Sequence, residues 1–287
     1  MSGGQKAEAP EANGNKIEMP RSIQRDITCT RCGRDYRIFI AYPGEAPPAS
    51  GYPVIYVLDA NSVFGTMAEA VRVQGRRPDK TGVIPAVIVG IGYRTEEPFD
   101  PARHRDFTMP VPESELPQSP DGNAWPEQGG AEAFLAFIEE ELKPQIEREF
   151  KIDRNRQAIF GHSLGGLFVL HTLFNKPGSF RNYIAGSPSI HWNKRILLEA
   201  ERRFSSGVER EGLDAGLLIG VGELEANHKA RMNENAREMS ERLAALESKG
   251  LRIAFKEFEN EGHVSVLPVL ISRAVRFALG SDNGGKR

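Results

Sequence analysis

The residues with the clearest chemical meaning are Gly161-His162-Ser163-Leu164-Gly165, which follow the pattern G-x-S-x-G. In this pattern the serine stands at the apex of a tight turn between a strand and a helix. The apolar run QAIF precedes the motif, and LGGLFVLHTLF follows it, as a buried strand and a buried helix would. We therefore predict that Ser163 is an exposed nucleophile and that its chemistry is acyl transfer.

A serine hydroxyl is a weak nucleophile at neutral pH and needs a general base. Behind a turn of this type, the acid and then the histidine follow the serine along the chain. His171, His191, His228 and His263 are the histidines after Ser163. We select His263, because FENEGHVSV forms a loop between the last expected strand and the last expected helix.

The acid that orients this histidine is expected after the run GLLIGVG, which ends at Gly222. Glu225, three residues beyond Gly222, is the first choice, and Glu223 is the second. Only one of them is expected to reach the histidine. A serine–histidine dyad without an essential acid is the remaining alternative.

The negative charge that develops on the attacked carbonyl oxygen requires two aligned backbone N–H donors. One is expected from Leu164, the residue after the nucleophile. The other is expected from the loop after the run VIYVLD, where we select Asn61. We interpret Asp59, in the same loop, as a residue that caps the turn.

Six short apolar runs predict the strands that position these residues. They lie at residues 54–59, 86–93, 157–161, 182–187, 216–222 and 251–258. Continuous apolar runs suit strands buried on both faces of a parallel sheet. Residues 131–150 and 227–249 carry apolar side chains at helical spacing. This alternation predicts an α/β fold with a mostly parallel twisted sheet and helices on both faces.

Composition and charge exclude several classes of protein. Lys and Arg number 37 against 39 Asp and Glu, so the net charge of −2 predicts no binding to nucleic acid or to an anionic membrane surface. The apolar runs are well short of the roughly 20 residues that span a bilayer. We expect one catalytic domain over residues 21–280, with solvated tails at 1–20 and 281–287. The first 20 residues lack the apolar core of a signal peptide, which favours a cytoplasmic location.

Cys29 and Cys32 form an isolated C-x-x-C motif. Gly33 and the alternating run YRIFIAY follow, which predicts an antiparallel N-terminal hairpin with the cysteines at its tip. Zinc normally needs four ligands, and no second C-x-x-C or nearby histidine pair is present, so no metal or other cofactor is expected. We interpret the pair as two surface thiols in a turn; the alternative is a reversible disulfide.

The sequence also resembles the esterase branch of the α/β-hydrolases that includes the siderophore esterases of the enterobactin and bacillibactin type. The matching strings are YRIFIAYP, PVIYVLDAN, RDFTMP, GHSLGGLFVLHTLF, AGSPSIHW, VGELE and GHVSVLP. The resemblance implies Ser163 and His263 as catalytic residues and supports Glu225. It also implies hydrolysis of a catecholate siderophore trilactone, with iron arriving only as part of the substrate. His191 stands where close relatives tend to carry an aromatic residue.

Two other functions remain alternatives at this point. Relatives with the same core hydrolyse S-formylglutathione or acyl sugars, so a general carboxylesterase or thioesterase is one of them. A binding module that keeps the fold but not the chemistry is the other. The presence of both Ser163 and His263 argues against the binding module.

A ferric tri-catecholate is a flat-ringed trianion, so its binding site is expected to combine guanidinium groups with an indole face. Arg105, in the shared string RDFTMP, is the first choice, followed by Arg103 and Arg94, with Trp192 across the cleft. The other interpretation of this segment is a solvated loop whose charges are balanced by neighbouring acids.

Overall fold

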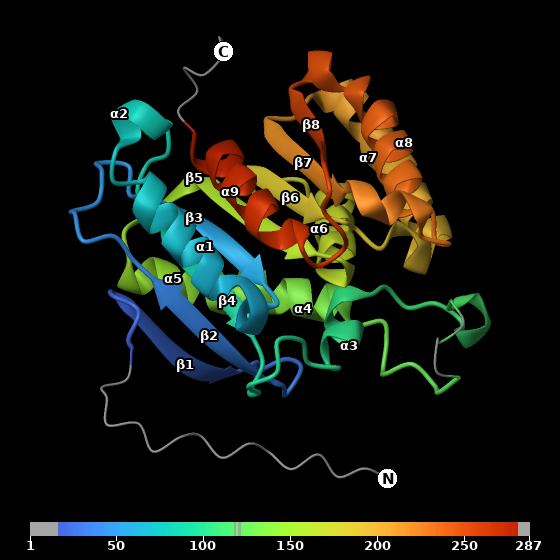
Figure 1. Cartoon of the computed structure of the whole chain (residues 1–287), viewed down its shortest axis with the longest axis horizontal. Coiled ribbons are helices and arrows are strands. Elements are labelled where there is room, and N and C mark those ends of the chain that lie inside the picture. Colours follow the sequence, from blue (N-terminus) through green and yellow to red (C-terminus); the bar gives the residue numbers. More distant parts are fainter. Residues whose placement is uncertain (1–16, 118, 120–121, 281–287) are drawn as a thin grey trace.

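A computed structural model describes residues 17–117, 119 and 122–280 of the chain. Within these residues, eight strands form one sheet (Figure 1). The strands are β1 Ser22–Thr28, β2 Asp35–Ala41, β3 Tyr52–Leu58, β4 Val87–Gly92, β5 Ile152–His162, β6 Asn182–Gly186, β7 Ala215–Gly222 and β8 Leu251–Phe258. Their order across the sheet is β1-β2-β4-β3-β5-β6-β7-β8.

Strand direction follows the prediction. β2 pairs antiparallel with both β1 and β4, and the other neighbours pair in parallel. All six predicted apolar runs fall on strands β3 to β8. β3, β4, β6 and β7 are buried along their whole length, because helices cover both of their faces. The predicted mostly parallel sheet with an antiparallel N-terminal hairpin is confirmed.

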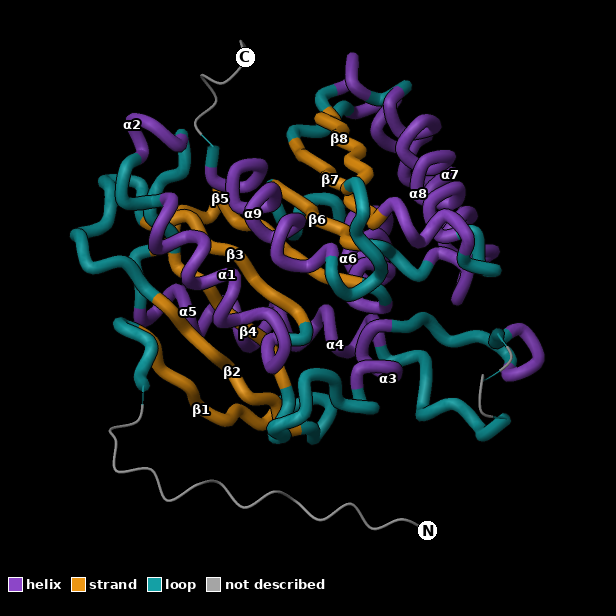
Figure 2. Tube along the Cα trace, in the orientation of Figure 1, coloured by secondary structure: helices purple, strands orange, loops and turns teal. Residues whose placement is uncertain are grey.

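Two layers of helices enclose the sheet (Figure 2). The helices are α1 Ala60–Gln74, α2 Pro78–Thr81, α3 Arg103–Phe107, α4 Ala131–Phe137, α5 Lys143–Glu149, α6 Leu164–Asn175, α7 Lys194–Glu211, α8 Met232–Ala244 and α9 Val266–Leu279. Shorter 3-10 turns cover Glu113–Glu115, Ile190–Asn193, Glu223–Asn227 and Glu247–Lys249. No helix within the described residues combines the length and apolar character that crossing a bilayer requires.

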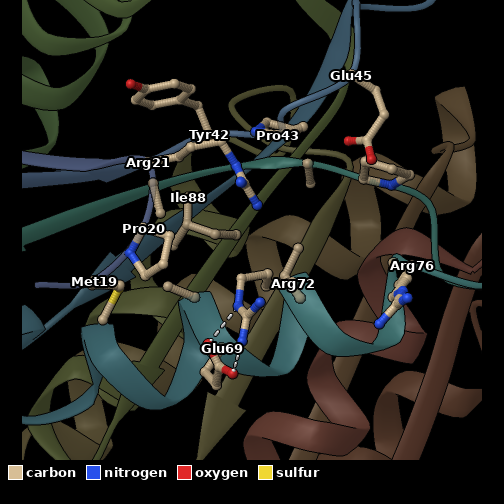
Figure 3. A pocket seen from close by; sticks show the side chains of 16 residues that line it. Met19, Pro20, Arg21, Tyr42, Pro43, Glu45, Glu69, Arg72, Arg76 and Ile88 are labelled. Carbon is tan, nitrogen blue, oxygen red and sulfur yellow. Dashed lines mark hydrogen bonds and ion pairs between the residues drawn. The ribbon is translucent and has the colours of Figure 1, made fainter.

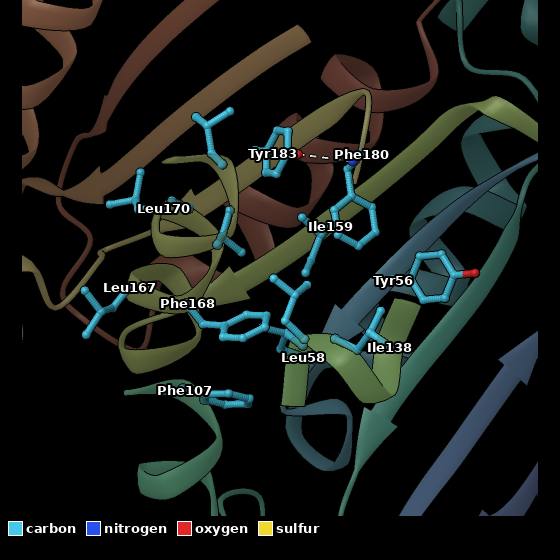
Figure 4. Close-up of a cluster of buried hydrophobic side chains, with 14 of the residues drawn as sticks. Tyr56, Leu58, Phe107, Ile138, Ile159, Leu167, Phe168, Leu170, Phe180 and Tyr183 are labelled. Carbon is cyan, nitrogen blue, oxygen red and sulfur yellow. Dashed lines mark hydrogen bonds between the residues drawn. The ribbon is translucent and has the colours of Figure 1, made fainter. Parts of the chain in front are cut away.

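Each layer of helices has its own apolar core. On one face, α1 and α9 pack against side chains such as Ile55 and Phe160. On the other face, α4, α6, α7 and α8 enclose a larger core, which includes Leu58, Phe168 and Tyr183 (Figure 4). Burial of this apolar surface at about 25 cal/mol per Å² is the main force that holds the helices to the sheet.

The segment 131–150, which was predicted as one helix, contains a π-helical turn. The segment forms α4, one wide π-helical turn at Ile138–Leu142, and then α5. Apolar residues recur here every four positions. In an ideal α-helix of 3.6 residues per turn, each of them would be rotated by about 40° relative to the preceding one, and the stripe would turn away from the sheet. The wide turn offsets this drift, so that Phe134, Ile138, Leu142 and Ile146 are all fully buried.

The sheet topology creates a crevice at the carboxyl ends of β3 and β5. The chain leaves β3 for α1 on one face of the sheet and leaves the adjacent β5 for α6 on the other face. Ligands of open α/β sheets bind at such switch points. The segments that carry Asn61 and Ser163 begin at this point.

The predicted tails lie mostly outside the described residues, which exclude 1–16 and 281–287. Residues 17–20 lead through a turn at Arg21 into β1, and the hydroxyl of Ser22 donates to the carbonyl of Met19.

Candidate active site

Ser163 stands between the end of β5 and the start of α6, in a backbone conformation that is rare for a residue with a side chain. Its φ is 59° and its ψ is −117°. Neighbouring backbone holds this strained turn in place. The N–H of Ser163 donates to the carbonyl of Gly186 at 2.9 Å, and its own carbonyl accepts from the N–H of Leu167 at 3.0 Å. The half-buried side chain is thereby aimed into the crevice.

Gly161 of the motif and Gly166, directly after it, allow the backbone to pack closely here. A Cβ on Gly161 would collide with the carbonyl of Gly165, and one on Gly166 would lie 2.7 Å from the carbonyl of Gly186. The first glycine therefore closes the turn, and the second allows α6 to approach β6.

The three residues selected as nucleophile, base and acid lie in one hydrogen-bonded row. Nε2 of His263 is 3.1 Å from Oγ of Ser163, and Nδ1 of His263 is 2.6 Å from Oε2 of Glu225. His263 lies in the loop between β8 and α9, and Glu225 lies in the 3-10 turn after β7. Three segments that are distant in sequence thus meet at one edge of the sheet.

The carboxylate of Glu225 is buried but fully hydrogen-bonded. Its Oε1 accepts from the hydroxyl of Ser187 at 2.6 Å and from the N–H of Gly222 at 2.8 Å, while Oε2 faces His263. Burial raises the pKa of Glu225, but the hydrogen bonds from His263, Ser187 and Gly222 outweigh it, and the pKa lies below its ordinary value. Glu225 is therefore ionised at neutral pH.

Glu223 lies in a different environment. It is exposed, and its carboxylate accepts from the N–H of Asn260 at 2.8 Å. The structure thus brings Glu225, and not Glu223, to His263.

Ser163 and His263 open into a cavity of about 590 Å³. This volume is within the range of roughly 300–1,000 Å³ that is usual for small-molecule sites. The other residues that line the cavity are Arg103, His104, Trp125, Leu164, Ser189, His191, Trp192, Leu224, Glu225, Asn227, His228 and Met232. Aromatic and histidine rings thus form much of its wall.

The two predicted oxyanion donors lie at helix N-termini. Leu164 is the first residue of α6, and Asn61 is the second residue of α1, where backbone N–H groups lack partners within the helix. The side chain of Asn61 binds the backbone of the segment after β4. It accepts from the N–H of Tyr93 at 2.8 Å and donates to the carbonyls of Tyr93 and Thr95. Only the backbone N–H of Asn61 therefore remains for an oxyanion, and this role stays a prediction.

The structure places two of the three selected arginines outside the cavity wall. Arg94 pairs with Asp26 and Asp35, and neither Arg94 nor Arg105 lines the cavity. Arg105 pairs instead with the carboxylate of Glu127 at 2.9 Å. Acidic partners from other segments hold both guanidinium groups.

Arg103 does line the cavity, but its charge is already paired. Its Nε and Nη2 donate to both carboxylate oxygens of Asp59 at 2.9 and 2.8 Å. Asp59 is therefore the ion-pair partner of Arg103; it stands at the N-cap position of α1, but its side chain makes no capping hydrogen bond there.

Sequence reasoning missed several residues of the site. Trp125 and His104 join the predicted Trp192 in the cavity wall, and Ser189 places its Oγ 3.3 Å from Oγ of Ser163. Ser187 supports the carboxylate of Glu225. Both serines lie in the string AGSPSIHW, and Trp125 and His104 lie in the proline-rich stretch 94–128. No local motif marks any of the four residues, so only the segments that contain them could be identified from the sequence.

The other candidate histidines divide into two groups. His171 is buried in α6 beside Asn175, as a helix-packing residue would be. His191 and His228 line the same cavity as His263, with their ring centroids 6.4 Å apart. Burial and the nearby His228 and His263 lower the pKa of His191 to about 4, so this ring is neutral at neutral pH.

The cysteine pair differs from its first interpretation. The structure joins Cys29 and Cys32 in a disulfide at the tip of the β1–β2 hairpin, and Cys29 is fully buried. The alternative interpretation, a disulfide, therefore describes the structure. Among the residues described, no three His, Cys, Asp or Glu side chains are arranged as a metal site.

A second cavity, of about 310 Å³, lies over β2 and α1 (Figure 3). Arg21, Tyr42, Glu45, Arg72 and Arg76 are among its lining residues, and Arg72 is paired with Glu69. None of the residues in the hydrogen-bonded row lines this cavity, so we assign the chemistry to the larger one.

A serine on a strained turn, a histidine and a buried carboxylate at the switch point of an α/β sheet define a serine hydrolase of the α/β-hydrolase type. Residues 29–264 match the family model described as "Putative esterase". The chain belongs to this family and is a hydrolase that acts on ester bonds.

Three similar proteins extend over nearly the whole chain. The ferri-bacillibactin esterase BesA of Bacillus subtilis is 61% identical over 268 residues, which cover 93% of each chain. The siderophore enterobactin esterase of Emericella nidulans is 36% identical and covers 84% of this chain and 88% of its own. The crystal structure of the BES protein from Bacillus cereus aligns with a TM-score of 0.88 at 44% identity, and covers 94% of this chain and all of its own.

Proposed function

We propose that the protein is a serine esterase that opens the trilactone of a catecholate siderophore and thereby promotes release of the bound iron. The row from Ser163 through His263 to Glu225, with contacts of 3.1 and 2.6 Å, is the observation that carries the reaction. The choice of substrate is supported by the similar proteins, which are esterases of bacillibactin and enterobactin.

In the first half of the proposed reaction, Oγ of Ser163 attacks a carbonyl carbon of the lactone while Nε2 of His263 accepts the hydroxyl proton. The backbone N–H groups of Leu164 and Asn61 bind the negative oxygen of the tetrahedral intermediate. The intermediate collapses, the ester C–O bond breaks, and His263 returns the proton to the leaving alkoxide. The product of this half-reaction is an acyl-enzyme on Ser163.

In the second half, a water molecule gives a proton to His263 and attacks the acyl carbon. The new tetrahedral intermediate then expels Oγ of Ser163, which recovers the proton. Glu225 holds the imidazole with its proton on Nδ1 and stabilises the imidazolium that forms in each half. Because Glu225 already has three hydrogen-bond donors, its carboxylate does not reorient during the cycle.

The cavity suits the proposed substrate through its aromatic walls rather than through free cations. Trp125, Trp192 and His104 offer ring surface, and the guanidinium of Arg103 is already paired with Asp59. Iron is cargo of the substrate, and the proposed reaction at the ester bond requires no resident metal.

A panel of substrates tests the proposal. The enzyme is incubated with ferric and iron-free catecholate trilactones, p-nitrophenyl butyrate and S-formylglutathione, and the products are followed by mass spectrometry. We expect kcat/KM for a trilactone to exceed that for the plain ester at least 100-fold, with Ser163→Ala lowering turnover on the order of 10⁴-fold. Preference for the plain ester or the thioester would make the protein a general carboxylesterase or thioesterase. No turnover of any substrate would indicate a binding module.

The cytoplasmic location stays a prediction. Fractionation of cells that produce the full chain, with detection by antibody, tests it directly.

A further inference from the structure

Three rings form one side of the cavity that holds Ser163. The ring of His104 stacks on Trp125, with centroids 5.5 Å apart and planes at 28°, and meets Trp192 edge-on at 5.5 Å. Trp125 and Trp192 lie edge to face at 4.6 Å. We call these three residues the aromatic wall. It brings together two parts of the proline-rich stretch 94–128, namely α3 and the segment around Trp125, with the 3-10 turn Ile190–Asn193.

A chain of hydrogen bonds behind the aromatic wall fixes the orientation of Gln128. The indole N–H of Trp192 can only donate, so the Gln128 atom that it meets at 3.0 Å is the carbonyl oxygen Oε1. The other atom of the carboxamide is therefore the NH₂ group. It donates to the carbonyl of Pro126 at 2.7 Å and faces Nδ1 of His104 at 3.4 Å.

The same chain fixes the proton on His104. Because the NH₂ group of Gln128 is a donor, Nδ1 of His104 is the acceptor, and a neutral ring then carries its proton on Nε2. Burial and the neighbouring Arg103 lower the pKa of His104 to about 4, so the ring is neutral at neutral pH. Within the described residues, Nε2 of His104 has no hydrogen-bond partner, and it is not buried from solvent.

The cavity therefore offers one polar N–H at the edge of an apolar aromatic surface. A ligand that used both features would have a flat ring to pack against the indoles and an oxygen on that ring to accept from Nε2. An ammonium could pack on an indole face, and an aliphatic group could contact it, but neither could accept from the Nε2–H. The guanidinium of Arg103, held by Asp59, has no comparable freedom.

We propose that His104 is a specificity-determining residue that donates its Nε2–H to a ring oxygen of the aryl group on the ester substrate, while that ring packs against Trp125 and Trp192. The inference rests on the proposed esterase function and adds the residue that distinguishes a hydroxylated aryl group from a plain one.

Two matched substrates test this role. One is the trilactone of N-(2,3-dihydroxybenzoyl)serine, and the other is the trilactone of N-benzoylserine, which lacks the ring oxygens. We expect His104→Phe, which keeps a flat ring but removes the donor, to raise KM for the hydroxylated trilactone about tenfold. KM for the benzoyl trilactone and both kcat values should change less than twofold. His104→Gln, which returns an N–H near the position of Nε2, should recover most of the loss.

A measurement that does not depend on turnover accompanies the kinetics. In ¹⁵N-histidine-labelled enzyme, the His104 ring is expected as the Nε2–H tautomer, and N-(2,3-dihydroxybenzoyl)serine should shift its Nε2 resonance whereas N-benzoylserine should not. Gln128→Glu removes the NH₂ donor and should place a proton on Nδ1.

An Nδ1–H tautomer in the unaltered enzyme would overturn the proposal. Equal KM changes for both trilactones in His104→Phe, or no change for either, would overturn it as well. If the enzyme hydrolysed p-nitrophenyl butyrate but neither trilactone, the proposed substrate would be wrong. The response of the His104 Nε2 resonance to N-(2,3-dihydroxybenzoyl)serine and N-benzoylserine would still decide the role of His104.

Discussion

Glu223 and Glu225 are separated by a single residue, yet the structure gives their carboxylates unrelated surroundings. Glu225 is 4% exposed and faces His263 at 2.6 Å, whereas Glu223 is exposed and accepts from the backbone of Asn260. We expect Glu225→Gln to lower kcat by about 10²- to 10⁴-fold, because an amide can hold the imidazole in the wrong tautomer. Glu223→Gln, the matched control, should stay within twofold of the unaltered rate.

Steady-state hydrolysis of p-nitrophenyl butyrate by the two variants decides this point. If Glu225→Gln kept the rate of the unaltered enzyme, the site would work as a serine–histidine dyad, and the selection of the acid would be wrong.

His162 makes a second prediction, which concerns stability and pH. Its ring is buried 4.7 Å from that of His263, and neither of its nitrogens has a partner in the described part of the chain. Burial, followed by the effect of His263, lowers the pKa of His162 to about 3, against an ordinary value of 6.5. The ring of His162 binds a proton more readily in the unfolded chain than in the folded protein. Its effect on the free energy of unfolding is therefore absent above pH 6.5, and below that pH it lowers the free energy of unfolding progressively down to about pH 3.

By pH 5 the contribution of His162 to this loss is about 2 kcal/mol. Between pH 7.5 and pH 5, we therefore expect the free energy of unfolding to fall by about 2 kcal/mol less in His162→Phe than in the unaltered protein. Urea unfolding at the two pH values measures the difference. Parallel losses in both proteins would show that His162 does not resist protonation in the fold.

The residues that could be predicted from the sequence are those with a local signature. Ser163 has its pentapeptide, and the places of His263 and Glu225 follow from the order of strands. Arg94, Arg103 and Arg105 have no such signature, and their carboxylate partners lie up to 68 positions away along the chain, at Asp26 for Arg94. Without the fold, nothing separates a paired guanidinium from one that is free to bind an anion.

At the scale of elements, the end of β4 and the start of α1 are coupled through Asn61. A Cβ on Gly92 would collide with the carboxamide oxygen of Asn61, the group that holds the backbone of Tyr93. We expect Gly92→Ala to displace the start of α1 and with it the proposed oxyanion donor, and so to lower kcat about 10- to 100-fold. KM should change much less, because neither Asn61 nor Gly92 is among the described residues that line the cavity.

Gly207→Ala is the matched control for this variant. Gly207 lies within α7, where an added Cβ meets no atom within 4 Å. The substitution should raise the melting temperature, since alanine stabilises a helix interior by about 1 kcal/mol relative to glycine, and it should leave kcat unchanged. Equal kcat values for both variants would mean that Asn61 is not needed at the site.

Helices and strands could be predicted from the sequence where burial determines the pattern of apolar residues. Strands β3, β4, β6 and β7 read as continuous apolar runs because both faces of the sheet are covered. The π-helical turn at Ile138–Leu142 was not identified, although the strict four-residue spacing of its stripe was visible. A repeat slightly longer than 3.6 residues was the signal, and it could have indicated a wide turn.

At the scale of the whole molecule, the cavity is built by segments that only the fold brings together. Segments after β5, β7 and β8 supply Ser163, Glu225 and His263, and the proline-rich stretch and the turn after β6 supply the aromatic wall. Sequence order predicts the first group, because successive parallel strands end at the same edge of the sheet. It does not predict how a long loop folds back over that edge, so Trp125 and His104 emerged only from the structure.

Rapid-quench mass spectrometry can detect the covalent acyl-enzyme that we propose between Ser163 and a siderophore trilactone. The alkoxide released when a lactone opens stays attached to the acyl group, so we expect the peptide containing Ser163 to gain the full mass of the iron-free trilactone within the first turnover. The adduct should be absent from Ser163→Ala, which should also fail to hydrolyse the substrate. An adduct on another residue, or continued turnover by Ser163→Ala, would show that Ser163 is not the nucleophile.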